Sequence, residues 1–242
     1  MAISDSQFLE SLAQISKQKQ EQFMDRIAER LGRSRGTKPL PNPFQGAPDF
    51  WRKQNVSLEE RIEQFMSNWR KAGGEAHRVD SLSKAQQLIC DAAASINAKR
   101  IICQHHPALQ SMKLAEKLAG TDVTVWGSLD SGKFVQQAAE AEIGIAIADY
   151  AVANTGSIVL MSGKDHGRTI SLLPPVFIAV VPISRMKTRL GEVMAEIHSL
   201  GRDNIPAGIH FVSGPSRSAD IENDLTIGVH GPGRVHAILA DF

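Results

Sequence analysis

Two glycine-rich segments near the C-terminus contain the residues best suited to chemistry. The first, SGPSRSADIE at 213–222, begins directly after a short apolar run. Gly214 permits a sharp turn, and Ser216 or Ser218 can cap a short helix whose free N–H groups would bind an anion beside the Arg217 guanidinium. The segment therefore predicts a pocket for a carboxylate or phosphate at the carboxyl end of a sheet. The alternative is a capped helix start in which the guanidinium pairs with a carboxylate of the same segment.

The second segment, GVHGPG at 228–233, precedes another strand-like run. Its three glycines and one proline specify a tight backbone around His230, which is the side chain there that can move a proton near neutral pH. His230 is therefore a candidate acid or base. A histidine that only bonds the loop to itself is the competing interpretation.

A third cluster combines the turn NTGS at 154–157 with the loop GKDHGR at 163–168. Both flank the same pair of expected strands, so we expect Thr155, Ser157 and Arg168 to converge at one sheet edge and to add donors to the anion pocket. Surface turn chemistry explains the asparagine and glycine of the turn equally well. The candidate ligand-binding residues are Thr155, Gly156, Arg168, Gly214, Ser216, Arg217, Ser218, Asp220 and Gly231.

Other patterns favour no metal or nucleotide site. In His105-His106-Pro107 the adjacent side chains diverge and no third ligand is spaced to meet them, so a turn is expected. The chain has neither a phosphate-binding loop nor a dinucleotide fingerprint. Cys90 and Cys103 are too few for the thiolates of a zinc or iron–sulfur site, and we expect buried free thiols.

The elements that must position these residues follow an α/β order. Short apolar runs alternate with helical periods from 76 to 148, which indicates parallel strands joined by right-handed crossovers. After 148 the rhythm changes, and a four-residue turn before 157–161 predicts an antiparallel hairpin joined to the same sheet. The apolar run 176–181 predicts a central strand. The expected fold is an open mixed, mostly parallel sheet flanked by helices.

The first 55 residues are expected to form a helical arm and an extended loop. Four prolines and two glycines interrupt the loop from 33 to 55, and the body at 56–242 opens with a capping box from Ser57 to Glu60. The arm must pack its stripe on the body or on a second copy, and we favour a homodimer. The stripe consists of Phe8, Leu12, Ile15, Phe23, Ile27 and Leu31.

Composition excludes several classes of protein. The 242 residues include 27 Lys and Arg against 26 Asp and Glu, and only 5% are aromatic, so a nucleic-acid binder is not expected. No apolar run reaches a membrane span and no signal peptide opens the sequence, which predicts a cytoplasmic protein.

The motifs, taken in order, resemble the LUD-domain family, and the opening FMDRIAERLGRSR at 23–35 is similar to its lactate-utilization branch. The resemblance implies a fold of the type shared by glucosamine-6-phosphate deaminase, ribose-5-phosphate isomerase and coenzyme A transferases. It also implies a role in oxidising L-lactate to pyruvate with two companion proteins, at least one of which carries iron–sulfur clusters. Asn154 and Ser218 depart from the family's more usual Asp and Thr.

Three functional hypotheses follow. The first is an accessory subunit of a lactate-oxidising system that holds a small carboxylate, with no cofactor of its own and no redox activity alone. The second is a stand-alone enzyme on a sugar phosphate or an acyl thioester, for which Glu222, Asp220 or Asp149 would supply the carboxylate nucleophile. The third is a structural module that docks companions through the arm.

Overall fold

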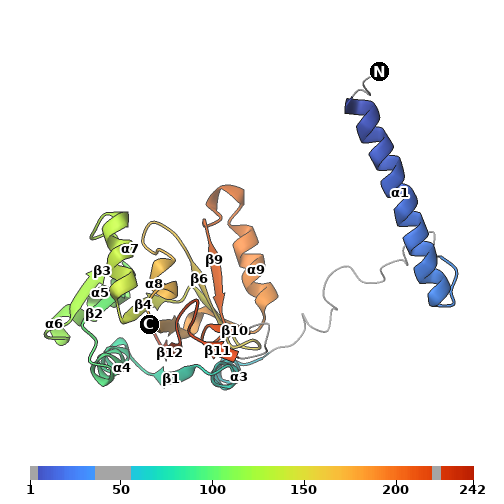
Figure 1. Cartoon of the computed structure of the whole chain (residues 1–242). Helices are drawn as coiled ribbons and strands as arrows, with labels where there is room; N and C mark the ends of the chain where they lie inside the picture. The colour runs from blue at the N-terminus through green and yellow to red at the C-terminus, as the bar shows by residue number, and fades with distance from the viewer. Residues whose placement is uncertain (1–4, 36–55, 220–224) are drawn as a thin grey trace. The chain divides into compact units, whose positions relative to one another are not determined.

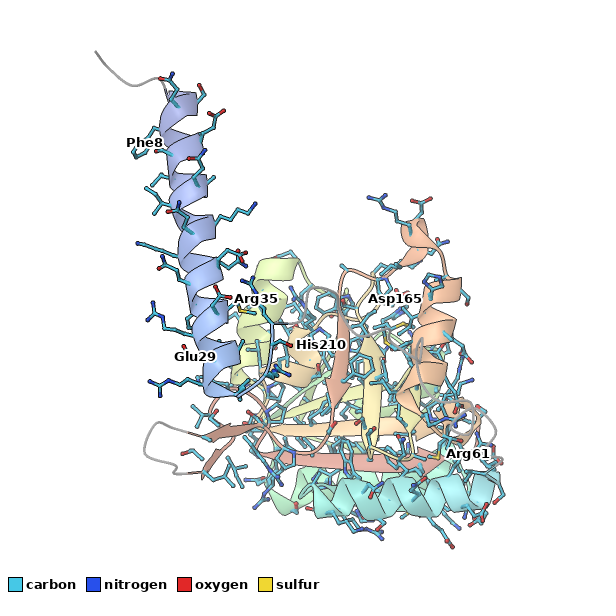
Figure 2. All side chains as sticks on the ribbon, turned by 90° about the vertical axis from the view of Figure 1, so that its right-hand side faces the viewer. Phe8, Glu29, Arg35, Arg61, Asp165 and His210 are labelled. Atoms are coloured by element: carbon cyan, nitrogen blue, oxygen red, sulfur yellow. The ribbon has the colours of Figure 1, made fainter. Side chains whose placement is uncertain are left out.

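A computed structural model of the chain describes residues 5–35, 56–219 and 225–242, which divide into compact units at 1–54 and 55–242 (Figure 1). In the first unit, α1 (Asp5–Arg30) is a single 26-residue helix. Arg35, labelled in Figure 2, lies beside this helix. Its guanidinium pairs with Glu21 and, at 3.2 Å, with Asp25. Among the described helices, none is long and apolar enough to cross a membrane.

The second unit is built on a six-stranded parallel sheet, in the order β1-β12-β7-β4-β2-β3. Buried residues fill β4 and β7 completely, as central parallel strands covered on both faces require. The predicted open, mostly parallel sheet is confirmed. Its strands are β1 (Glu75–Val79), β2 (Arg100–Cys103), β3 (Asp122–Val125), β4 (Ile143–Ile147), β7 (Val176–Pro182) and β12 (Arg234–Ala240).

Helices cover both faces of this sheet. The predicted capping box is confirmed at α3, where Ser57 and Glu60 each accept from the other's backbone N–H. One core contains Trp69 of α3 and Phe134 of α7, and the other contains Ile89 of α4. The helices are α3 (Leu58–Lys71), α4 (Leu82–Ser95), α5 (Pro107–Ser111), α6 (Leu114–Lys117), α7 (Ser131–Glu140), α8 (Thr169–Leu172), α9 (Leu190–Ser199) and the 3-10 turns η1 (Ile183–Arg185) and η2 (Arg202–Asn204).

The expected hairpin forms, but it belongs to a second sheet. β5 (Tyr150–Val152) and β6 (Ser157–Met161) pair antiparallel within a four-stranded sheet of order β8-β5-β6-β9, with β8 at Met186–Lys187 and β9 at Ile209–Val212. The expectation that this hairpin joins the first sheet is wrong. β5 is displaced because β4 already pairs with β2 and β7 on its two sides.

The helix expected after Ser213 is also absent from the described part of the segment. Residues Arg217–Ala219 form β10, which pairs antiparallel with β11 (Leu225–Ile227). The predicted capping role of Ser216 or Ser218 is therefore wrong, because the backbone N–H groups here pair with a strand and a loop rather than opening a helix.

Candidate functional site

The two glycine-rich segments lie side by side. The Ser216 N–H donates to the Pro232 carbonyl at 2.9 Å, and the Gly228 N–H donates to the Ser216 carbonyl at 2.9 Å. A Cβ at Gly231 would lie 3.3 Å from the Ser216 Cβ, so the segments touch at this glycine. The contact is backbone to backbone, and it shapes the start of the β10–β11 ribbon.

Arg217 has a protein partner at the end of α3. Its guanidinium donates to the carbonyl of Ala72, the C-cap residue that follows α3. Gly214 makes this approach possible. Its backbone, with φ at +93°, lies so close to the end of α3 that a Cβ at Gly214 would be 2.7 Å from the Ala72 carbonyl oxygen. Arginine donors commonly satisfy the last carbonyls of a helix. Arg217 thus fastens the ribbon to the end of α3.

The remaining predicted residues of this region differ in exposure. His230 is exposed in the turn before β12, and Ser218 is partly buried within β10. Asp220 and Glu222 lie outside the described residues. The acid–base role of His230 stays a prediction.

A chain of hydroxyl groups joins the turn before β6 to the end of β9. The Ser157 Oγ donates to Thr155 Oγ1 at 2.8 Å and lies 2.6 Å from Ser213 Oγ. Gly156, with φ at +58°, packs so closely on α3 that a Cβ at Gly156 would lie 2.6 Å from the backbone nitrogen of Trp69. The turn is therefore a packing contact with α3 as well as a source of hydroxyl donors.

Arg168 lies at the other end of β6. Its side chain is beside Gly208, whose carbonyl accepts from the Ser162 N–H after β6 ends. Because β6 runs between this end and Thr155, the expected convergence of Thr155 with Arg168 is wrong. The local signals placed both next to the same strand but did not determine that they flank its opposite ends.

Two histidines, His166 and His210, lie near Arg168 at this end of β6; His210 is labelled in Figure 2. His166 is only 4% exposed, and neither of its ring nitrogens has a hydrogen-bond partner among the described residues. Burial, with repulsion from a charged His210, lowers the pKa of His166 to about 4. Burial and the Arg168 charge lower the pKa of His210 as well. The cluster is held as neutral imidazoles at physiological pH.

A cavity of about 240 Å³ opens where the central parallel strands end. This edge is where open α/β sheets bind ligands. The volume is below the roughly 300–1,000 Å³ of pockets for drug-sized molecules, so it suits a small ligand. It is lined by Gln104, His106, Ile147, Ala148, Asp149, Pro182, Ser184, Arg185 and Phe242.

Acid, base and cationic side chains converge on this cavity. Burial raises the pKa of Asp149, against the lowering effects of the Met161 N–H, which donates to its Oδ2 at 2.6 Å, and of Arg185. His106 Nδ1 accepts from the Ala108 N–H at 3.1 Å, so the neutral ring carries its proton on Nε2. Arg185 lies over the Tyr150 ring, with its guanidinium carbon 5.7 Å from the ring centre. The cavity can therefore bind an anion and exchange a proton.

Sequence reasoning named Asp149 as a possible nucleophile but missed Gln104, His106 and Arg185 as its neighbours. The expectation that His105-His106-Pro107 forms a turn is wrong, because His106 is an extended N-cap and Pro107 is the first residue of α5. A usable signal was present, because Gln104 comes one residue after the apolar run of β2 and Asp149 two residues after that of β4.

The sequence predicts that both cysteines are buried free thiols. Both are free; Cys103 is buried, as expected, and Cys90 is partly buried. Burial raises the pKa of Cys103 to about 12.

Known proteins resemble this chain over most of its length. A solved DUF162 family protein from Deinococcus radiodurans, 22% identical, covers 77% of this chain and 99% of its own with a TM-score of 0.59. Lactate utilization protein C of Halalkalibacterium halodurans is 33% identical over 93% of this chain and 98% of its own. Its counterpart in Bacillus subtilis is 32% identical over 92% and 96%. The LUD domain model matches residues 62–240, and the chain therefore belongs to the LUD-domain family.

Proposed function

We propose that this chain is an accessory subunit of a system that oxidises L-lactate to pyruvate. The observation that carries the proposal is the similarity to Lactate utilization protein C, which is 33% identical and spans 93% of this chain. The reaction releases two electrons and two protons, and the electrons need an acceptor. The chain has two cysteines, fewer than the four thiolates of a usual cluster, so we place the iron–sulfur clusters on a companion protein.

The cavity at the carboxyl ends of the strands is the site we assign to a small carboxylate. Arg185 lines it, and a guanidinium pairs with a carboxylate through two parallel hydrogen bonds. The Nε2–H of His106 is a donor for the second polar group of a 2-hydroxy or 2-oxo acid. We therefore favour this cavity as the carboxylate site over the loop around Arg217, because the Arg217 guanidinium already donates to the Ala72 carbonyl.

Asp149 gives the cavity a group that can hold a proton. Its burial opposes ionisation, while Arg185 and the Met161 N–H favour it. A carboxyl balanced in this way can accept a hydrogen bond from a 2-hydroxyl or donate one to a 2-oxo group. We therefore infer that the subunit binds lactate or pyruvate without carrying out the electron transfer itself.

Calorimetric titration of the purified chain with L-lactate and with pyruvate tests the site. We expect saturable heat at millimolar ligand, at least a tenfold loss of affinity in Arg185→Gln, and little change in Arg217→Gln, since a charged hydrogen bond contributes about 1.5–3 kcal/mol. The reverse ranking would move the site to the loop pocket, and the absence of heat with both acids would remove the carboxylate role.

The pathway role has a separate test in the source organism. Deletion of the gene is expected to abolish growth on L-lactate but not on pyruvate, and the wild-type gene is expected to restore it. Affinity purification of the chain under anaerobic conditions is expected to recover a companion with iron–sulfur absorption. Turnover of a sugar phosphate or an acyl thioester by the isolated chain would instead support a stand-alone enzyme.

We also propose that α1 joins two copies of the chain. Its stripe includes Phe8, Leu12 and Ile15, which are between 46% and 53% exposed within a helix that has no apolar partner in its own described unit. Two such helices can bury their stripes against each other. Sedimentation is expected to show a dimer for the full chain and monomers for Leu12→Glu/Ile15→Glu, whereas a dimer in that variant would exclude the helix as the interface.

A further inference from the structure

Two histidines and a carboxylate meet at the amino-terminal end of the parallel sheet, at the opposite ends of the strands from the cavity described above. Glu75 and His77 belong to β1, and His236 belongs to β12. Glu75 is the register partner of His236 in the parallel ladder, so their side chains are neighbours on one face. His77 lies on that face too, because strand side chains alternate with a period of two.

The donor atoms of these three side chains converge. His236 Nδ1 lies 3.5 Å from Glu75 Oε2, and His77 Nε2 lies 4.0 Å from the same oxygen. One donor atom from each of the three residues lies within 4.8 Å of the others. Within the described residues, no other group of three or more His, Cys, Asp or Glu side chains meets this spacing.

This spacing is close to what a transition-metal ion requires. Zinc bonds to histidine nitrogen and carboxylate oxygen at about 2.0–2.2 Å, which places tetrahedral donors roughly 3.3–3.6 Å apart. The Glu75–His236 pair already has this separation. His77 is more than a third exposed, and its side chain can rotate to close the remaining gap without disturbing the core.

The backbone that carries the donors is held in place. The Trp69 indole N–H donates to the Glu75 carbonyl at 3.0 Å, and a Cβ at Gly74 would lie 2.2 Å from that indole nitrogen. The first residue of β1 is therefore fixed by close packing on α3. Ligands that project from strands fixed in this way are preorganised, which favours binding.

Open space adjoins the cluster. A cavity of about 270 Å³ is lined by the three side chains and extends between α4 and the sheet, past Leu88 and Ile178. Three protein donors beside open space is the arrangement of metal sites that keep one position for water or a further ligand. Asp91 and Arg234 also line the cavity. Their opposite charges offset each other, so the Glu75 carboxylate remains the main electrostatic attraction for a cation.

We propose that Glu75, His77 and His236 form a binding site for one divalent transition-metal ion, with Zn²⁺ as the best match to two imidazoles and one carboxylate. Imidazole nitrogens together with a carboxylate oxygen suit zinc and cobalt rather than magnesium or calcium, which prefer oxygen donors alone. The fourth position faces the cavity.

Cobalt titration of the full-length chain, freed of any histidine tag and of metal, tests this site directly. Co²⁺ in a four- or five-coordinate protein site absorbs visible light far more strongly than the hydrated ion. We expect the absorption to saturate at one equivalent and to be abolished by one equivalent of Zn²⁺. His77→Gln and His236→Gln are each expected to weaken binding by at least about tenfold.

The matched control is His198→Gln, because His198 is an exposed histidine on α9 that belongs to no such cluster. It is expected to bind cobalt as the wild-type chain does. Circular dichroism and the metal-free thermal midpoint of each variant check that the fold is retained. Equal affinity in the wild-type chain and in both cluster variants, or the absence of saturable absorption at millimolar Co²⁺, would overturn the proposal.

Discussion

The guanidinium of Arg217 donates a hydrogen bond to the carbonyl of Ala72, and this contact joins the β10–β11 ribbon to the end of α3. Gly73 and Gly214 flank the contact, and a Cβ at Gly73 would lie 3.0 Å from the Arg217 side chain. Arg217, which the sequence suggested as an anion-binding residue, thus also donates a hydrogen bond that satisfies a carbonyl at the end of α3. Its charge remains on the surface, but its position is set by α3.

Replacement of Arg217 by alanine is expected to lower the thermal midpoint by a few degrees, because it leaves a helix-ending carbonyl without its donor. Arg217→Lys is expected to recover part of the loss, since lysine retains a donor but not the planar fork. Differential scanning calorimetry measures both. A midpoint equal to that of the wild-type chain in the alanine variant would show that the contact contributes nothing to stability.

The buried His166 predicts a loss of stability in acid. Its folded-state pKa is about 4, below the ordinary value of 6.5, through burial and the neighbouring His210. Between these values the unfolded chain binds a proton that the folded chain does not, so the free energy of unfolding falls as pH decreases, by about 2 kcal/mol at pH 5. The positive charge of Arg168 also opposes protonation of the neighbouring His210, whose pKa it lowers.

Urea unfolding at pH 7.5 and pH 5 measures this effect. His166→Met is expected to show a smaller difference between the two pH values than the wild-type chain, because the variant has nothing to titrate at that position. His198→Met, at an exposed position, should keep the wild-type difference. If His166→Met keeps it as well, the acid sensitivity arises elsewhere.

Gly144 of β4 is expected to tolerate no side chain. A Cβ there would lie 1.9 Å from the Ile170 carbonyl oxygen, because α8 packs directly on the strand. Gly144→Ala must separate the helix from the sheet, and we expect a loss of about 2 kcal/mol or more. Gly163→Ala is the control, since a Cβ at Gly163 meets nothing within 4 Å, and its effect should stay within about 0.5 kcal/mol. Equal effects in chemical denaturation would contradict this packing argument.

The two cysteines are expected to differ in reactivity. Cys103 is buried with its pKa raised to about 12, whereas Cys90 is partly exposed and its pKa is raised by burial and by Asp91. Because the thiolate is the reactive form, both should react slowly at neutral pH, and Cys103 should react only when the chain unfolds. Thiol titration of Cys90→Ser in native buffer should find no reactive group, and one in denaturant. Rapid native labelling of that variant would show that Cys103 is accessible.

The sequence alone determined the elements whose signals are local. The capping box at Ser57 and Glu60, the apolar run that became β7 and the alternation that produced a parallel sheet each depend on residues within a few positions of one another.

Only the tertiary structure decided which distant groups meet. β6 separates Thr155 from Arg168, although both are near it in sequence, and the register between β1 and β12 brings Glu75 beside His236 from opposite ends of the body. Local patterns record turns, caps and strands, whereas the partner of a side chain depends on strand order and register. These are set by the burial of the whole sheet between its helices, and no short stretch of sequence contains them.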